Sequence, residues 1–279
     1  FHARRRPRRD TSSPGPARTH DVGVGSPIAG LQVSCTEIML APRQIAPVAG
    51  CTVWLADIGE PVAPQARSVL SNDELARAGR FVFEKHRHRF MAARVALRQV
   101  LSRHVGARPG SLDFIYGPQG KPALAGYPDC HFNMSHSGRY ALMAIGRDAA
   151  IGVDIEIDRP VDDVEQMALE HFDESERSAL AALAPEARSK SFLRGWTRKE
   201  AVLKAMGTGF STHDFPHTGI DSRHQVVEIP ATRQAMPRHA SLLSFVLADI
   251  DAVASVAWLL PVVERQDRHH DAQAHQSLP

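Results

Sequence analysis

The 279-residue sequence has few cysteines, few aromatic residues and no long apolar run. Its three cysteines, Cys35, Cys51 and Cys130, form no C-x-x-C pair, which argues against a disulfide framework and against a zinc site. No apolar stretch reaches the roughly 20 residues that a membrane helix needs. The formal net charge is only +2, so bulk charge does not indicate a nucleic-acid partner. These absences favour a cytoplasmic, globular protein that binds neither nucleic acid nor membranes.

Both ends of the chain are biased in composition. Residues 1–20 hold six arginines and a single acidic residue, together with several prolines and serines. We expect residues 1–49 to form a disordered basic extension, with a transit peptide as the alternative. The tail, residues 265–279, is rich in histidine and is also expected to be disordered.

The body between these ends has the pattern of a mixed α/β fold. We expect a strand over Cys51–Ile58 and a helix that starts after Ser71, because Glu74 follows three residues later as in a capping box. A long helix should span Lys85–Val105. Shorter strands are predicted over Leu112–Tyr116, His131–Met134 and Arg139–Ile145.

The second part of the body repeats this plan. Four pairs of residues share an offset of 102: Ser71 and Asp173, Glu74 and Glu176, Phe90 and Phe192, and Leu101 and Leu203. We therefore predict an α/β (α+β) pseudo-dimer of two similar halves, residues 50–149 and 150–264. A cleft between such halves is a common place for a ligand.

Acidic residues alternate with apolar ones over Ile151–Asp158. On a strand, Asp154 and Glu156 would share one face, where they could converge on a hard cation such as Mg²⁺. The alternative is a half-buried strand with a solvated acidic face. Asp158 is expected to end the strand.

A predicted helix over Ser189–Met206 carries Glu200 and Lys204 on one face. Such a Glu can bind metal or accept a proton, and a Lys one turn away can neutralise phosphate charge. The alternative is a surface ion pair. Lys199 falls within the apolar stripe of this helix, so it either extends outward or meets an anion. At the 102-residue offset, Glu200 and Lys204 correspond to Arg98 and Ser102, which predicts one catalytic centre per chain.

The first half offers candidate phosphate contacts. A tight loop over residues 117–122 presents Lys121, but it lacks the Ser or Thr of a Walker loop. Ser135 and His136 lie before a glycine turn and could donate hydrogen bonds to phosphate. As neighbours on a strand they point to opposite faces, which argues against a Ser/His hydrolase.

Taken in order, the motifs G-K-P, F-N-x-S-H-S-G, I-G-V-D-I-E and W-x-x-K-E-A-x-x-K resemble the phosphopantetheinyl transferase superfamily over about residues 50–260. Two fused halves resemble its monomeric, surfactin-synthetase-activating type. The resemblance implies an enzyme that uses coenzyme A and Mg²⁺, modifies a serine of an apo acyl or peptidyl carrier protein and releases adenosine 3′,5′-bisphosphate. The carrier could serve fatty-acid, polyketide or nonribosomal-peptide synthesis.

Carried over by motif, Asp154, Glu156 and Glu200 would hold the cation, and Glu200 and Lys204 would be catalytic. The coenzyme contacts would be Arg77, Arg89, Lys121, Ser135, His136 and Lys199. Glu74 departs from the family pattern, because a basic residue is often found at that position. Two alternatives remain open: another Mg²⁺-dependent phosphotransferase or pyrophosphatase, and a catalytically inactive carrier-binding module.

Overall fold

The computed structural model describes residues 42–48, 50–208, 215–231 and 238–261, which all lie within one unit, Ile38–Pro279. The elements of the first half are, in chain order, β1 (Arg43–Val48), β2 (Cys51–Asp57), α1 (Pro64–Arg67), α2 (Asn72–Gly79), α3 (Glu84–Val105), the 3-10 turn η1 (Pro109–Ser111), β3 (Phe114–Tyr116), β4 (Pro122–Leu124), β5 (Cys130–Ser137) and β6 (Tyr140–Arg147).

The second half begins after a short turn. Its elements are β7 (Ile151–Ile157), α4 (Val164–His171), α5 (Glu174–Ala181), α6 (Pro185–Met206), β8 (His224–Ile229), β9 (Arg238–Leu247), the 3-10 turn η3 (Ala248–Ile250) and β10 (Ala252–Leu259). Each half forms a four-stranded antiparallel sheet, in the orders β1-β2-β6-β5 and β7-β10-β9-β8. The hairpin β3-β4 stands apart from both. The predicted α/β fold of two similar halves is confirmed.

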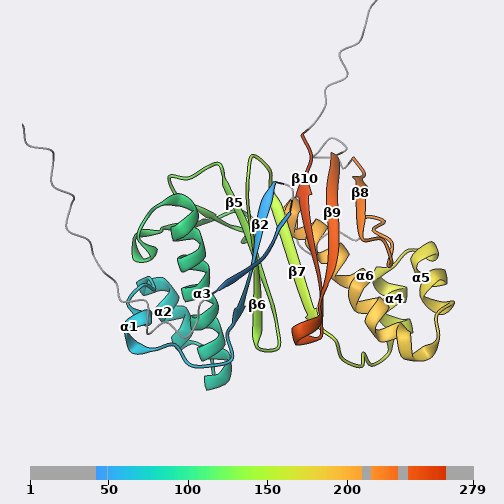
Figure 1. The fold of residues 1–279 in the computed structure, drawn as a ribbon, viewed down its shortest axis with the longest axis horizontal. Helices are drawn as coiled ribbons and strands as arrows, with labels where there is room; N and C mark the ends of the chain where they lie inside the picture. The colour runs from blue at the N-terminus through green and yellow to red at the C-terminus, as the bar shows by residue number, and fades with distance from the viewer. Residues whose placement is uncertain (1–41, 49, 209–214, 232–237, 262–279) are drawn as a thin grey trace, which may run out of the picture. The chain divides into compact units, whose positions relative to one another are not determined.

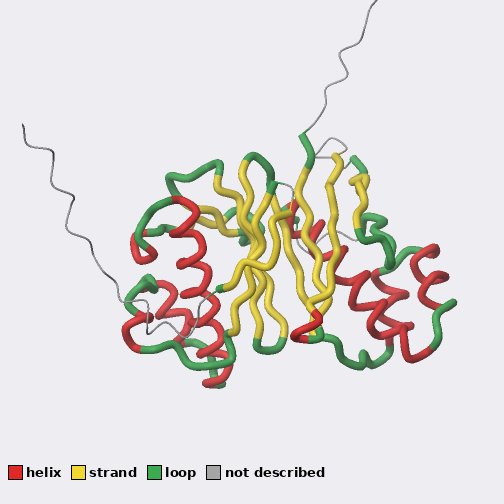
Figure 2. Tube along the Cα trace, in the orientation of Figure 1, coloured by secondary structure: helices red, strands yellow, loops and turns green. Residues whose placement is uncertain are grey.

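The two sheets pack against each other, and each carries helices on its outer face (Figures 1 and 2). Val53 and Leu142 of the first sheet meet Val153 and Val256 of the second in one buried cluster. Helix α3 packs on the other face of the first sheet, and α6 on the other face of the second. Strand β7 is therefore enclosed between the first sheet and α6.

Both predicted capping boxes are present. The Ser71 side chain accepts from the Glu74 backbone N–H and the Glu74 carboxylate accepts from the Ser71 N–H, and Asp173 and Glu176 repeat the arrangement. The long helices α3 and α6 end at Gly106 and Gly207, each with a positive φ that glycine adopts without strain.

The contacts correct the register of the repeat by one residue. Arg98 Nε lies 2.8 Å from Glu74 Oε2, and Lys199 Nζ lies 2.7 Å from Glu176 Oε2. Arg98 therefore corresponds to Lys199, 101 residues later, and not to Glu200. The terminal glycines Gly106 and Gly207 share this offset, so a residue is gained or lost between the short helices and the long ones.

The ordered body starts earlier than residue 50. Strand β1 pairs with β2 at the edge of the first sheet, although it falls within the extension that we expected to be disordered. Pro47 has no backbone N–H to donate. An edge strand such as β1 tolerates a proline because the backbone on its outer side pairs with no other strand. The sequence patterns also missed α4 and the three strands β8–β10. Residues 1–41 and the predicted tail, residues 265–279, lie outside the described residues.

The described residues contain free cysteines and no helix suited to span a membrane. Cys51 and Cys130 are buried free thiols, and Cys35 lies outside the described residues. Among the described helices, none combines the length and the apolar character needed to cross a membrane.

Candidate active site

The acids of β7 lie beneath α6. The odd-numbered residues of β7 pack between the two sheets, so Asp154 and Glu156 point to the opposite face. Asp154 is 4% exposed and the Glu156 side chain is 22% exposed. The alternation is as predicted, and a solvated acidic face is excluded for Asp154.

Gly152 lets α6 approach this face of β7 closely. A Cβ on residue 152 would lie 2.0 Å from the Ala201 carbonyl oxygen and 2.3 Å from the Ala205 nitrogen. Real Cβ atoms essentially never come so near to backbone atoms. Helix and strand therefore touch backbone to backbone, one residue along β7 from Val153 and two from Asp154.

This approach brings Glu200 and Lys204 over Asp154. Lys204 Nζ lies 2.7 Å from Asp154 Oδ1 and 3.7 Å from Glu200 Oε2. The Lys204 side chain is partly exposed, whereas both carboxylates are largely buried. The Lys204 ammonium group thus bridges the β7 acid Asp154 and the α6 acid Glu200.

Strand β5 of the first half completes the cluster. Ser135 Oγ donates to Asp154 Oδ1 at 2.6 Å and accepts from Lys204 Nζ at 3.1 Å. Ser137 Oγ donates to Glu156 Oε2 at 2.7 Å, and Asn133 Oδ1 accepts from the Val153 N–H at 3.0 Å. Alternate side chains of β5 therefore join the two sheets along β7.

Asn133 and Ser137 are site residues that the sequence reasoning missed. The period-two alternation that separated Ser135 from His136 could have found them, because it places residues 133, 135 and 137 on one face. His136 points away from this face and is exposed. The structure therefore brings Ser135, but not His136, into contact with the acids.

The cluster carries an excess of negative charge. Burial raises the pKa of Glu200 to about 7; Lys204 opposes the rise, and Asp154 and Glu156 add to it. Burial also raises the pKa of Glu156, against the hydrogen bond from Ser137 and with help from Asp154. Three carboxylates face the Lys204 ammonium group and the Arg159 guanidinium, which lies 3.8 Å from Glu156 Oε2. A bound cation would stabilise the negative charge that remains.

The donor set fits a hard cation. Asp154 Oδ2 is buried and has no hydrogen-bond partner among the described residues, and oxygen atoms of carboxylates are the ligands that Mg²⁺ prefers. A second group of possible metal ligands, Asp173, Glu176 and His217, has its ligand atoms within 4.8 Å of one another. That second group is occupied from within: Glu176 accepts from the Thr218 and Gly219 N–H groups and pairs with Lys199.

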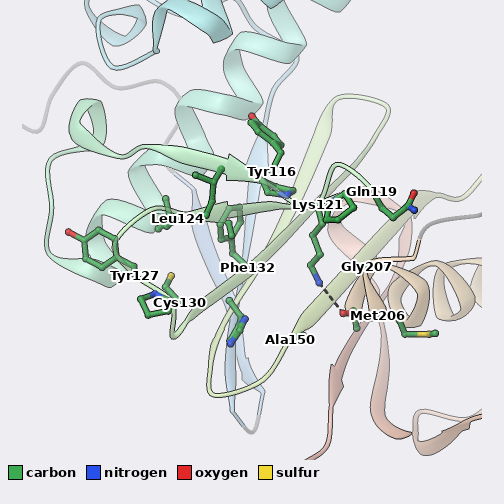
Figure 3. A pocket seen from close by; sticks show the side chains of 18 of the residues that line it. Tyr116, Gln119, Lys121, Leu124, Tyr127, Cys130, Phe132, Ala150, Met206 and Gly207 are labelled. Atoms are coloured by element: carbon green, nitrogen blue, oxygen red, sulfur yellow. Dashed lines mark hydrogen bonds between the residues drawn. The ribbon is translucent and has the colours of Figure 1, made fainter. Parts of the chain in front are cut away.

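A cavity of about 720 Å³ lies beside the C-terminal end of α6 (Figure 3). Tyr116, Leu124, Tyr127 and Phe132 of the first half line it, together with Met206 of α6. Its size and its apolar, aromatic walls are typical of small-molecule sites.

Lys121 lies in the wall of this cavity, with its ammonium group turned toward α6 (Figure 3). The Nζ atom donates to the carbonyl oxygens of Ile151, Lys204 and Ala205 at 3.0, 2.6 and 3.0 Å. Burial lowers its pKa to about 8, although three carbonyl acceptors favour the charged form. This placement differs from the expected contact with a coenzyme phosphate.

Lys199 lies on the far side of α6 from the acid cluster. Its side chain is 2% exposed, pairs with Glu176 and donates to the Pro216 carbonyl at 2.9 Å. The repeat explains this cation within an apolar stripe, since Arg98 pairs with Glu74 in the first half. The structure does not bring Lys199 to the other predicted coenzyme contacts.

An arginine-rich cavity of about 470 Å³ lies between α2 and α3. Arg77, Arg80 and Arg94 line it, beside the ring of Phe90, over which the Arg77 guanidinium lies at 5.2 Å. Arg94 is an unpredicted member: its side chain is 8% exposed, it binds Glu74 through Nε, and its Nη2 has no hydrogen-bond partner among the described residues. The wall also holds Asp73, Glu74 and Asp113, and Glu74 is paired with Arg94 and Arg98. Arg77 and Arg80 are therefore the cations that this cavity offers to an anion.

Glu74 and Arg89 lie in or near this cavity. Glu74, which departs from the family pattern, is neutralised by Arg94 and Arg98 and so does not repel an anion as a free acid would. Arg89 is half-buried near the start of α3 and is not part of the cavity wall.

Comparison with known proteins gives this arrangement a family. The chain is 38% identical over 210 residues to a 4′-phosphopantetheinyl transferase, HetI, of Nostoc sp. (strain PCC 7120), a match that covers 74% of this chain and 86% of that protein. The chain belongs to the 4′-phosphopantetheinyl transferase superfamily.

Other matches agree with this membership. The model of the 4′-phosphopantetheinyl transferase superfamily matches residues 150–250, and that of the 4′-phosphopantetheinyl transferase N-terminal region matches residues 61–147. The transferase Sfp of Bacillus subtilis (strain 168) is 32% identical over 52% of this chain and 63% of its own length. The transferase AcpT of Escherichia coli (strain K12) is 36% identical over 43% of this chain and 58% of its own length.

The phosphopantetheinyl transferase halves meet at the acid cluster. The two matched ranges change over between β6 and β7, as the two sheets do. Asp154, Glu200 and Lys204 lie in the second range, and Ser135 lies in the first. This enzyme therefore builds its candidate active site from both halves.

Proposed function

We propose that this transferase moves the 4′-phosphopantetheine group of coenzyme A to a serine of an apo acyl or peptidyl carrier protein and releases adenosine 3′,5′-bisphosphate. The observation that carries the proposal is the meeting of Asp154, Glu200 and Lys204 at the junction of the two halves. Attack on a pyrophosphate needs charge neutralisation, in-line positioning and a proton acceptor. These three side chains offer the first and the last of these at one place.

Asp154, Glu156 and Glu200 would hold Mg²⁺. The buried, unpartnered Oδ2 of Asp154 and the raised pKa of Glu200 both support a cation at this point. When bound, the ion would neutralise charge on the pyrophosphate and on the leaving group. Ser135 and Ser137 would orient the Asp154 and Glu156 carboxylates through the hydrogen bonds that they donate.

Glu200 would accept the proton of the carrier serine, directly or through water. A carboxylate within hydrogen-bond reach of the serine hydroxyl, or one water away from it, can act as the general base. The serine oxygen forms a bond to the phosphorus next to pantetheine while that phosphorus releases the bridging oxygen. The electron pair leaves with adenosine 3′,5′-bisphosphate, and Lys204 stabilises the charge that develops on these oxygens.

The coenzyme would be held mainly by the first half. We assign the pyrophosphate to Ser135, beside the acid cluster, and the 3′-phosphate to the cavity of Arg77 and Arg94. His136, on the opposite face of β5, and Arg89, outside the cavity wall, are further candidates for the phosphates of the coenzyme. The unpartnered Nη2 of Arg94 supports this assignment, because a buried guanidinium nitrogen without an acceptor is costly. Lys121 and Lys199 are not included, since both ammonium groups are bound within the protein.

We further propose a cytoplasmic monomer that binds neither nucleic acid nor membranes. One chain supplies both sides of the site, which removes the need for a second subunit to complete it. The buried free thiols of Cys51 and Cys130 are compatible with a reducing compartment. Carriers of fatty-acid, polyketide and nonribosomal-peptide synthesis offer the same serine chemistry, and the assay decides among them.

The test is incubation of the purified chain with coenzyme A, MgCl₂ and a panel of apo-carriers, read by intact mass. We expect one carrier class to gain the mass of a single phosphopantetheine, with adenosine 3′,5′-bisphosphate released in equal amount and no transfer in EDTA. Phosphate release without a mass gain would favour a different phosphotransferase or a pyrophosphatase. Binding of coenzyme A and carrier without transfer would favour an inactive carrier-binding module.

A further inference from the structure

The β3–β4 hairpin of the first half sends one cation into the second half. Lys121 Nζ donates to the carbonyl oxygens of Ile151, Lys204 and Ala205, all three of which belong to the second half. Figure 3 draws one of these bonds, to the end of α6. An ammonium group has three N–H donors and no acceptor. Each donor of Lys121 therefore has a carbonyl, and none is left for a phosphate.

The end of α6 is suited to receive this cation. The last carbonyls of a helix have no partner within the helix and carry its negative end, which a cation stabilises. Gly207 ends the helix with a φ of 76°, and a Cβ at this position would lie 3.4 Å from Lys121 Cδ. The stem of Lys121 thus packs against the C-terminal turn while its head binds the free carbonyls.

One of the three residues whose carbonyls Lys121 binds, Lys204, also carries a side chain of the acid cluster, and the other two lie next to it. The carbonyl of Lys204 is held by Lys121, and the side chain of Lys204 contacts Asp154. The carbonyl of Ile151 is held by the same ammonium at the start of the strand that bears Asp154. One ammonium group therefore fixes the end of α6 against the start of β7, beside the close approach at Gly152.

We propose that Lys121 is a positioning residue, which sets the contact between Lys204 and Asp154 from the first half of the chain. The inference rests on the proposed function of Lys204 in transfer. Loss of the three hydrogen bonds would release the last turn of α6 from β7 and displace the Lys204 ammonium group. A displacement of 1 Å in a catalytic constellation can cost about 100-fold in rate. The effect should therefore fall on kcat rather than on coenzyme binding.

The experiment compares Lys121→Met, which keeps the stem but removes the charge and the donors, with Lys121→Arg and with the exposed control Lys85→Met. Rates of carrier loading per folded enzyme are measured with coenzyme A and with 3′-dephospho-coenzyme A. We expect Lys121→Met to lower kcat about 10- to 100-fold for both substrates, with KM for coenzyme A changed less than about 3-fold. Lys121→Arg should recover part of kcat, and Lys85→Met should match the wild type.

Two results would overturn the proposal. One is a raised KM that is confined to coenzyme A, as expected of a phosphate ligand; the other is a wild-type kcat for folded Lys121→Met. If Lys121→Met does not fold, Lys121→Arg decides: a lower kcat at constant KM supports positioning, and a raised KM at constant kcat refutes it. Loading by the wild type in the same assay tests the proposed function separately, because its failure would be seen before any variant is compared.

Discussion

The carbonyl oxygen of Ala201 lies 2.0 Å from the point that a Cβ on Gly152 would occupy. This contact sets how near α6 comes to β7, and therefore how near Lys204 comes to Asp154. Both elements are buried on this side, so neither can move outward without losing packing against the second sheet.

The first prediction concerns Gly152→Ala. The added methyl group meets backbone atoms of α6, which cannot rotate away as a side chain could. We expect the free energy of unfolding to fall by at least about 1–3 kcal/mol and carrier loading to be lost. Urea unfolding and the intact-mass assay measure the two effects. Gly79→Ala is the control, because a Cβ there meets nothing within 4 Å, and wild-type behaviour of both variants would contradict the close approach.

The second prediction concerns the chemistry of Glu200. Glu200→Gln keeps the shape of the side chain but removes its charge and its capacity to accept a proton. We expect kcat for carrier loading to fall at least about 100-fold without any fall in the melting temperature. Glu228→Gln, on an exposed position of β8, is the matched control. Near-normal loading by Glu200→Gln would refute the assignment.

The third prediction concerns the pH dependence of stability in metal-free protein. Burial raises the pKa of Glu200 from 4.5 to about 7 in the folded state. Between these pH values the folded protein holds a proton that the unfolded chain has lost, so this residue makes the free energy of unfolding decrease as pH rises. Above pH 7 the loss is constant. Glu200→Gln removes this dependence. The free energy of unfolding of the variant should therefore exceed that of the wild type by an amount that grows between pH 4.5 and 7 to roughly 3 kcal/mol.

Urea unfolding in EDTA at pH 5, 6, 7 and 8 measures this difference. Comparison with the variant at each pH cancels the titration of the groups that do not interact with Glu200, because both proteins share it. The difference that remains belongs to Glu200 and the partners coupled to it, Asp154, Glu156 and Lys204. An advantage of equal size at pH 5 and pH 8 would show that Glu200 is ionised throughout, and would exclude a pKa near 7.

Local sequence patterns predicted the parts of the fold that local physics determines. The two capping boxes, the long helices and the alternation on β7 depend on residues within a few positions of one another. The one-residue correction to the repeat was not predictable, since it arises between helices where no pattern marks it. The three strands β8–β10 were missed although β10 is almost wholly buried, because a continuous apolar run has no period that identifies a strand.

The candidate site likewise combines features that local sequence predicts with contacts that it does not. Asp154 and Glu200 could be placed on their elements from spacing alone, whereas the partners of Lys121 could not. Its acceptors are backbone carbonyls, which every residue has, so no sequence signal marks them. Lys199 shows the same limit: its buried partner Glu176 follows from the repeat only after the contacts have matched Lys199 to Arg98, which pairs with Glu74.

The fourth prediction follows from that buried pair. Lys199→Met leaves the Glu176 carboxylate without its cation in a site where both side chains are almost fully buried. We expect a loss of about 3–5 kcal/mol in the free energy of unfolding, and partial recovery in the double variant with Glu176→Gln. The KM of the folded variant for coenzyme A should be unchanged. A raised KM with unchanged stability would return Lys199 to the coenzyme contacts.

The fifth prediction concerns the arginine-rich cavity between α2 and α3. Arg77 stacks on Phe90 and lines this cavity, so Arg77→Gln should keep the packing of its stem while it removes the charge. We expect KM for coenzyme A to rise about 3- to 10-fold, since a charge-assisted hydrogen bond contributes about 1.5–3 kcal/mol at most when fully formed. The rise should be absent with 3′-dephospho-coenzyme A, which lacks the phosphate that we assign to this cavity.

Arg103→Gln is the matched control, because Arg103 lies on the same helix but over the ring of Trp54. Its kinetics should equal those of the wild type with both substrates. An equal rise in KM for coenzyme A and its dephospho form in Arg77→Gln would mean that the cavity does not receive that phosphate. The Nη2 of Arg94 would then need another acceptor, because the described residues supply none and a buried donor without one is costly.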